Sequence, residues 1–272
     1  MVDVRGVSYQ VDRTVILRDI TTRFQPNRFN VILGPNGAGK STLLRVATGL
    51  LQPTTGDVSY GHQLVGSFSA LELARKRAVL SQHVELAFAL TVEDVALMGR
   101  YPHYDRVPST RDRDIVRQAL ALVGMEHKRR QQYPTLSGGE QQKVQLARVL
   151  AQIWNDGSGA EHTYLFLDEP TTSLDVHYQI HLLDVARGLL HHDCTIVAIL
   201  HDLNVAFQYG DVFFVMDAGR LVHVATSAAD LSRDLIERVF QVQAHRIHDP
   251  DSGDAVWRFA LQGNGRRGGT ES

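Results

Sequence analysis

Short apolar runs recur along the chain and alternate with segments whose apolar residues have helical spacing. Phe29–Leu33 is a mostly apolar run that stops at Gly34, and Lys40–Leu50 then places leucines and a valine at helical intervals. We therefore predict a strand, a glycine loop and a helix, in this order. Gly49 and then Pro53 are expected to end the helix.

Three further apolar runs predict buried strands, at Tyr164–Leu167, Thr195–Leu200 and Val212–Met216. The first two lead into polar residues and are apolar throughout, which is typical of parallel strands covered on both faces. Val2–Tyr9 alternates loosely and is expected to form an antiparallel strand. Asp217–Arg220 is expected to be a hairpin turn. Together these elements predict an α/β fold.

The middle of the chain has a helical pattern instead. Thr91 is followed three residues later by a carboxylate, as in a capping box. Ser109 or Thr110 is expected to begin a second helix. The buried face of that helix is expected to hold Ile115, Ala119, Leu122 and Val123. We interpret about residues 85–155 as a helical subdomain inserted into the α/β core.

Composition and charge narrow the class of protein. The chain has 272 residues, enough for one large domain or two small ones, with 43% hydrophobic and 21% charged residues. A net charge of −2 argues against a general nucleic-acid binder. Cys194 is the single cysteine, so no internal disulfide forms and a reducing compartment fits best. No apolar run approaches the about 20 residues that span a bilayer.

The first chemical motif is a glycine-rich loop of the form G-x-x-x-x-G-K-[ST], between the first apolar strand and its helix. It comprises Gly34, Pro35, Asn36, Gly37, Ala38, Gly39, Lys40, Ser41 and Thr42. Glycines let several backbone N–H groups point at one anion, and the helix N-terminus adds positive charge. Lys40 would reach the β- and γ-phosphates, and the Ser41 hydroxyl would bind Mg²⁺. The motif predicts a nucleotide site.

The second motif is a pair of adjacent carboxylates, Asp168 and Glu169, at the end of the apolar strand Tyr164–Leu167. In open α/β sheets, ligands bind at the carboxyl ends of the strands. We expect Asp168 to hold Mg²⁺, directly or through water, and Glu169 to orient and deprotonate an attacking water.

The third motif, Leu136-Ser137-Gly138-Gly139-Glu140, opens a helix and offers a second anion site. One nucleotide cannot occupy this site and the first loop in the same subunit. Together with the two other motifs, this segment resembles the ATP-binding cassette ATPases, and the resemblance covers about residues 2–240. It implies a P-loop NTPase core with an N-terminal antiparallel β subdomain and an inserted α-helical subdomain.

The resemblance assigns roles to further residues. Gln82 matches the glutamine that contacts Mg²⁺ and links the core to the helical subdomain, and Ser173-Leu174-Asp175 matches a loop that crosses the dimer interface. His201 matches the histidine that contacts the γ-phosphate and supports Glu169. Tyr9 matches the aromatic residue that stacks on adenine, although a lone tyrosine after a strand is more often a packing residue.

The resemblance also implies a mechanism. Two copies of the chain would enclose two ATP molecules with Mg²⁺, and Lys40, Glu169 and His201 would be the catalytic residues of each site. Ser137, Gly138 and Gly139 of the other copy would complete that site. Hydrolysis would remove the γ-phosphate contact that both copies share, so the dimer would open.

Local features resemble one group within the family. The segment Leu86–Tyr104 is similar to importers of iron chelates, vitamin B12 and haem, and Arg77–His83 and Leu146–Trp154 are similar to the haemin-import ATPases of bacterial type II importers. The resemblance implies a peripheral ATPase on the cytoplasmic face of the bacterial inner membrane, bound to a permease dimer. A periplasmic substrate-binding protein would be an indirect partner, and no nucleic acid is expected. A ferric-siderophore or vitamin B12 importer stays open as an alternative.

Two other classes of protein fit this sequence less well. A soluble cassette protein of DNA repair or translation usually carries two cassettes or long coiled-coil arms, and a P-loop kinase has no need of the third motif. The 13 histidines include His177 and His181, four residues apart, but lack the companion ligands of a metal site.

Residues 1–240 are expected to form the ATPase domain, 241–262 an extension with a short hairpin, and 263–272 a disordered tail.

Overall fold

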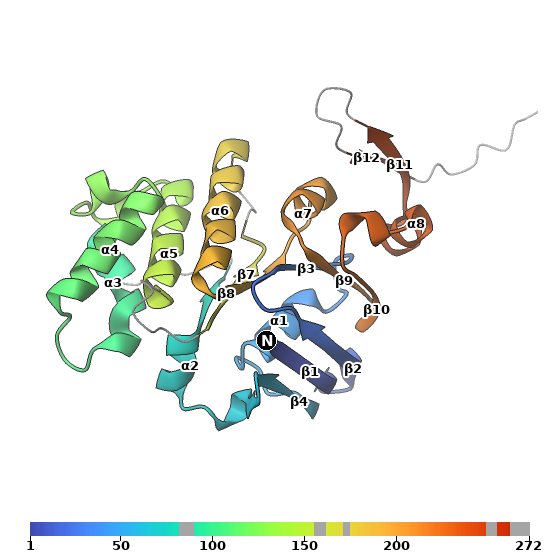
Figure 1. The fold of residues 1–272 in the computed structure, drawn as a ribbon, viewed down its shortest axis with the longest axis horizontal. Coiled ribbons are helices and arrows are strands. Elements are labelled where there is room, and N and C mark those ends of the chain that lie inside the picture. Colours follow the sequence, from blue (N-terminus) through green and yellow to red (C-terminus); the bar gives the residue numbers. More distant parts are fainter. Residues whose placement is uncertain (82–89, 155–161, 171–174, 249–254, 262–272) are drawn as a thin grey trace, which may run out of the picture.

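The computed structural model describes residues 1–81, 90–154, 162–170, 175–248 and 255–261. Two sheets form its centre (Figure 1). The antiparallel sheet has the order β2-β1-β4-β5. Its strands are β1 (Val2–Val11), β2 (Thr14–Phe24), β4 (Thr55–Tyr60) and β5 (Gln63–Leu64).

The second sheet has the order β10-β9-β3-β8-β7-β6 and is parallel apart from β10. Its strands are β3 (Phe29–Leu33), β6 (Arg77–Leu80), β7 (Thr163–Asp168), β8 (Cys194–Ile199), β9 (Val212–Asp217) and β10 (Arg220–Ala225). The predicted turn joins β9 to β10 through Ala218 and Gly219, which both have positive φ. This geometry suits the twist of a hairpin.

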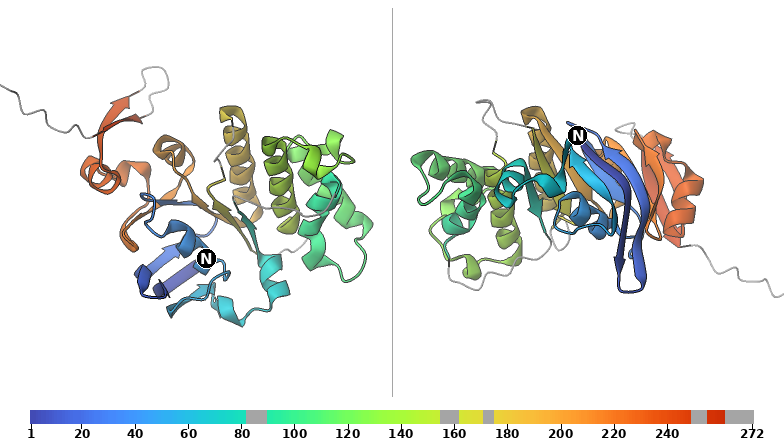
Figure 2. Two further views of the ribbon diagram at one scale, coloured as in Figure 1. Left: turned by 180° about the vertical axis from the view of Figure 1, so that it is seen from behind. Right: turned by 90° about the horizontal axis from the view of Figure 1, so that it is seen from below.

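Helices cover both faces of the parallel sheet (Figures 1 and 2). The α-helices are α1 (Lys40–Ala47), α2 (Ala70–Lys76), α3 (Val92–Leu97), α4 (Thr110–Leu122), α5 (Gly138–Gln152), α6 (Val176–Gly188), α7 (Leu203–Tyr209) and α8 (Arg233–Phe240). Short 3₁₀ helices are η1 (Val65–Ser67), η2 (Met98–His103), η3 (Glu126–Lys128), η4 (Tyr133–Thr135), η5 (Leu189–His192) and η6 (Ala228–Asp230). A hairpin of β11 (Val242–His248) and β12 (Ala255–Leu261) follows α8.

Two hydrophobic clusters lie on opposite faces of the parallel sheet, which explains the uninterrupted apolar runs. In β3, Val31 belongs to the cluster shared with the helices α3 to α7, whereas Ile32 belongs to the cluster shared with α1 and the antiparallel sheet. Leu165 and Phe166 divide in the same way in β7. Alternate residues of one strand point to opposite faces, so both faces require apolar side chains.

The helical elements α3, α4 and α5 gather at one end of the molecule, and the β11–β12 hairpin lies at the other (Figure 1). Thr91 and Asp94 form the predicted capping box before α3, and Ser109 with Asp112 forms another before α4. Among the described residues, no helix has the length and apolar character needed to cross a bilayer.

One expectation about the helices was wrong, and another was confirmed. The side chain of Leu122 is exposed (45%), because its helical angle lies about 110° from the centre of the face formed by Val116, Ala119 and Leu120. The helix α1 ends at Ala47, and Gly49 adopts a positive φ of 74° just after it, as expected for the residue that ends the helix.

Candidate functional site

The glycine-rich loop lies at the carboxyl end of β3, between β9 of the parallel sheet and β2 of the antiparallel sheet. Gly34 has a φ of 151°, and a Cβ there would lie 2.2 Å from the Met216 carbonyl oxygen in β9. Gly39 has a φ of 92°, and its Cβ would lie 2.9 Å from Cδ2 of Leu17 in β2. Only glycine fits both positions, because any side chain would be strained and would clash with neighbouring groups.

The Lys40 side chain folds back over this loop. Its Nζ donates hydrogen bonds of 2.9 Å to the Gly34 carbonyl and 2.9 Å to the Pro35 carbonyl. Burial lowers the pKa of Lys40, and the nearby carboxylates of Glu169 and Asp168 oppose that shift. A buried ammonium therefore lies where the loop curls, with its charge balanced by two carboxylates across the site.

The two carboxylates come from the end of β7, at the same sheet edge. Ser41 Oγ donates a hydrogen bond of 2.9 Å to Asp168 Oδ1, which joins the helix after the loop to this strand. Burial raises the pKa of Asp168, while the Ser41 hydrogen bond and the charge of Arg45 act in the opposite direction. Arg45 was not predicted from the sequence; it lies four residues after Ser41 and so on the same side of α1.

Glu169 is held in an unusual backbone conformation next to His201. Its φ is 52°, in the left-handed region that a non-glycine residue adopts at a cost of about 1 kcal/mol or more. Its Oε1 lies 2.7 Å from Nε2 of His201, which follows β8. The structure therefore brings Lys40, Ser41, Asp168, Glu169 and His201 together at the carboxyl edge of β3, β7 and β8.

The third motif lies at the start of α5, in the helical part of the molecule. Ser137 caps the helix through a capping box with Glu140, whose carboxylate also accepts a 2.5 Å bond from Lys128 Nζ. That hydrogen bond, together with those from Ser137, lowers the pKa of Glu140 to about 2. A Cβ on Gly138 or Gly139 would meet no atom within 4 Å. None of the hydrogen bonds among the described residues joins this motif to the glycine-rich loop.

The remaining predicted site residues are dispersed. Tyr9 pairs with Leu17 across β1 and β2, and Leu17 is the residue that approaches Gly39. Asp175 caps α6, its Oδ1 accepting a 2.9 Å bond from the Tyr178 N–H. Gln82 lies outside the described residues, as do Ser173 and Leu174 of the predicted interface loop.

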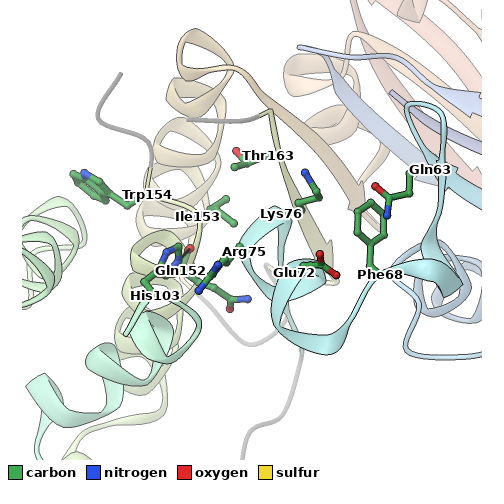
Figure 3. A pocket seen from close by; sticks show the side chains of 10 residues that line it. All are labelled: Gln63, Phe68, Glu72, Arg75, Lys76, His103, Gln152, Ile153, Trp154 and Thr163. Carbon is green, nitrogen blue, oxygen red and sulfur yellow. Dashed lines mark hydrogen bonds between the residues drawn. The ribbon is translucent and has the colours of Figure 1, made fainter. Parts of the chain in front are cut away.

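A separate cavity of about 420 Å³ lies between α2, η2 and the end of α5 (Figure 3). Figure 3 shows the side chains of Arg75, His103 and Gln152 gathered on one side of it. His103 Nε2 lies 2.8 Å from the Gln152 carbonyl, and Arg75 Nε donates a 2.6 Å bond to the Pro102 carbonyl. Burial lowers the pKa of His103, and the hydrogen bond to the Gln152 backbone acts in the opposite direction.

A phosphate-cradling loop and a carboxylate pair at one edge of a parallel sheet define a P-loop nucleotide hydrolase. A family model described as "ABC transporter" matches residues 17–172, more than half of the chain. The chain therefore belongs to the ABC transporter family, as one of its ATPase cassettes.

Two named relatives and one solved structure show which members of this family the chain is similar to. The chain is 42% identical to the Hemin import ATP-binding protein HmuV of Gloeobacter violaceus, covering 93% of this chain and 92% of that protein. It is 39% identical to HmuV of Methylobacillus flagellatus, covering 93% and 94%. Among solved structures, the dimeric bacterial ABC transporter cassette MJ0796 has a TM-score of 0.71 and 25% identity, covering 83% of this chain and 98% of that one. The predicted α/β P-loop fold is confirmed.

Proposed function

We propose that this chain is the ATP-hydrolysing subunit of a haem importer of the bacterial inner membrane. The observation that carries the ATPase part of the proposal is the meeting of Lys40, Ser41, Asp168, Glu169 and His201 at one sheet edge, beside a loop that only glycines can form. This grouping has the parts that phosphoryl transfer requires: an anion cradle, a cation and a base. The haem cargo is proposed from the 42% and 39% identity to proteins named Hemin import ATP-binding protein HmuV.

Lys40 would exchange its partners when ATP binds. Its ammonium now donates to two loop carbonyls, and the Ala38 N–H donates to one of them, the Pro35 carbonyl, at 3.2 Å. The same ammonium would turn toward the β- and γ-phosphates, where it stabilises the negative charge of the transition state. Tyr9, beside the Leu17–Gly39 contact, is in reach of the loop and would stack on the adenine ring.

Ser41 and Asp168 fit a magnesium ion. Both offer hard oxygen donors, and their 2.9 Å hydrogen bond places the hydroxyl and carboxylate oxygens next to each other. Mg²⁺ bound there would neutralise phosphate charge. Gln82 is the third ligand that the family resemblance implies.

Glu169 would act as the base. Its Oε1 lies 2.7 Å from His201 Nε2, which fixes the direction of the carboxylate, and the other oxygen would orient and deprotonate a water. In this arrangement His201 would also contact the γ-phosphate, so it links the state of the nucleotide to the base.

A second copy of the chain would complete the site. Gly138 and Gly139 have open space around them, and Ser137 with Gly138 is exposed, so another molecule can approach the start of α5. Backbone N–H groups at a helix N-terminus bind anions, here the γ-phosphate held by the partner copy. Asp175, at the start of α6, would lie at the interface of this homodimer.

The cavity beside α2 and η2 would receive the permease. It lies where the core meets the helical subdomain, and Gln152 joins the two by donating to the Ala74 and Arg77 carbonyls at 2.8 and 2.9 Å. The ATPase would thus sit on the cytoplasmic face, held by a permease dimer. A periplasmic substrate-binding protein would deliver the cargo on the other side.

Growth on haemin tests which cargo is transported, and the Glu169→Gln variant tests whether transport needs ATP hydrolysis. A strain that lacks this chain should fail to grow on haemin as its sole iron source, and the wild-type chain should restore growth where the Glu169→Gln variant does not. Normal growth on haemin with loss of growth on a ferric siderophore would overturn the haem assignment and leave the ATPase intact. A permease should co-purify from detergent-solubilised membranes, and its identity gives an independent check.

A further inference from the structure

The β11–β12 hairpin is bonded to the first turn of α7. Asn204 Nδ2 donates a 3.0 Å hydrogen bond to the Trp257 carbonyl, and the Trp257 N–H donates a 2.9 Å bond to Asn204 Oδ1. The Asn204 amide therefore pairs with the backbone of β12 in both directions, as a neighbouring strand would. Such a reciprocal pair fixes the distance and the orientation of the two elements.

Side-chain packing supports the same contact. The Trp257 ring is 6% exposed, and its centroid lies 6.3 Å from that of Phe207, one turn further along α7. On the other strand, Ala244 is fully buried, and its N–H donates a 2.8 Å bond to Glu237 Oε1 of α8. The inner face of the hairpin is thus anchored on α7 and α8, whereas Arg258 points to the exposed face.

The bonded turn of α7 is also the turn that begins beside His201. Asp202 caps this helix, its Oδ1 accepting bonds of 2.8 Å from the Asn204 N–H and 3.2 Å from the Val205 N–H. Asn204 is therefore held by its backbone to the residue after His201 and by its side chain to the hairpin. Because the His201 side chain is 42% exposed, its direction depends on the backbone that carries it.

We propose that Asn204 is a positioning residue and the β11–β12 hairpin a brace, which together set the His201 ring against Glu169. The chain of contacts runs from Trp257 through Asn204 and Asp202 to His201, then across 2.7 Å to the base. This inference rests on the proposed function, since it assumes that His201 and Glu169 act in ATP hydrolysis. It gives a role to the extension after residue 240.

The test replaces Asn204 by leucine, which has a similar size and removes both hydrogen bonds, in the full-length chain. We expect kcat for ATP to fall about tenfold while KM stays within about twofold, because ATP binding does not use this contact. Asn204→Asp keeps the acceptor for the Trp257 N–H and loses one bond, so its kcat should be intermediate. Arg258→Ala, next to Trp257 on the exposed face, is the matched control and should keep the wild-type kcat.

A double-mutant cycle separates positioning from a general loss of stability. In a His201→Ala background, the Asn204→Leu change should lower kcat by less than about twofold, since the ring that it positions is gone. Equal losses in both backgrounds, or an unchanged kcat for Asn204→Leu alone, would overturn the inference. If instead wild-type chain hydrolyses no ATP, or His201→Ala is fully active, the proposed function itself has failed.

Discussion

Replacing Arg100 by methionine should destabilise the helical subdomain by about 3 kcal/mol. The Arg100 and Asp112 side chains are only 8% and 7% exposed, and Arg100 Nε lies 2.9 Å from Asp112 Oδ1. Arg100 also donates a 2.7 Å bond to the Ala151 carbonyl at the end of α5. Breaking a buried pair by removing one partner costs about 3–5 kcal/mol, because the other charge stays buried.

The lower end of that range applies here. Asp112 keeps the bonds from the Ser109 N–H and hydroxyl, at 2.9 and 2.6 Å, so its charge is not left without partners. For a chain of this size, about 3 kcal/mol corresponds to a fall in Tm of about 6–12 °C. Thermal unfolding followed by circular dichroism measures it, with Arg117→Met as the matched control.

The Arg117→Met control and the pH dependence of the Tm difference distinguish the buried pair from a surface pair. Arg117 pairs with Asp114 on the surface, both 47% exposed, so its loss should cost less than about 0.5 kcal/mol. Burial alone would raise the pKa of Asp112, but the Ser109 and Arg100 hydrogen bonds outweigh it and lower the pKa below its usual 3.8. The stabilisation is thus present above the unfolded-state pKa and is lost as pH falls through the folded-state value. The Tm difference between wild type and Arg100→Met should narrow in acid; equal Tm losses for both arginine variants at pH 7 would refute the reasoning.

Three further outcomes follow from the geometry. Glu169→Gln should still bind ATP and dimerise by size exclusion, with turnover reduced at least about 100-fold in a phosphate-release assay; wild-type turnover would remove Glu169 from its role. Cys194 is buried and its thiol pKa is raised to about 12, so iodoacetamide at pH 8 should modify it only after unfolding in urea, by mass spectrometry. Gly99→Ala would place a Cβ 2.0 Å from the Arg148 carbonyl oxygen and should lower Tm, whereas Gly188→Ala, with open space around it, should not.

The local parts of this structure could be predicted from the sequence because their causes are local. Thr91 forms its capping box with a residue three positions away, and the loop from Gly34 to Thr42 needs only a strand before it and a helix after it. Leu122 shows where local reasoning fails. Its spacing from Ile115 fits a helical face, but the direction of that face is set by what packs on α4.

Long-range contacts could not be predicted in this way. Arg100 and Asp112 are both charged, and a pattern of polar residues predicts a solvated surface unless the tertiary fold buries them. Asn204 and Trp257 are 53 residues apart, and their bonds use the backbone of one partner, which leaves no trace in residue type. Lys40 and Asp168 could be predicted from their motifs and His201 from the family resemblance, and the three lie together because the parallel strands β3, β7 and β8 end at the same edge of the sheet.

The last turn of α5 is fixed to η2, so a rotation there would move the distant start of the helix. Arg100 bonds the Ala151 carbonyl and His103 the Gln152 carbonyl, so the last turn of the helix is pinned to η2, which lines the cavity. The helix has 15 residues, and at about 1.5 Å per residue Ser137 lies about 22 Å from this pivot. A tilt of about 5° at the pivot would displace Ser137 by about 2 Å, more than half the length of a hydrogen bond. Small rotations at the cavity end are therefore enough to make or break contacts at the far end of the helix.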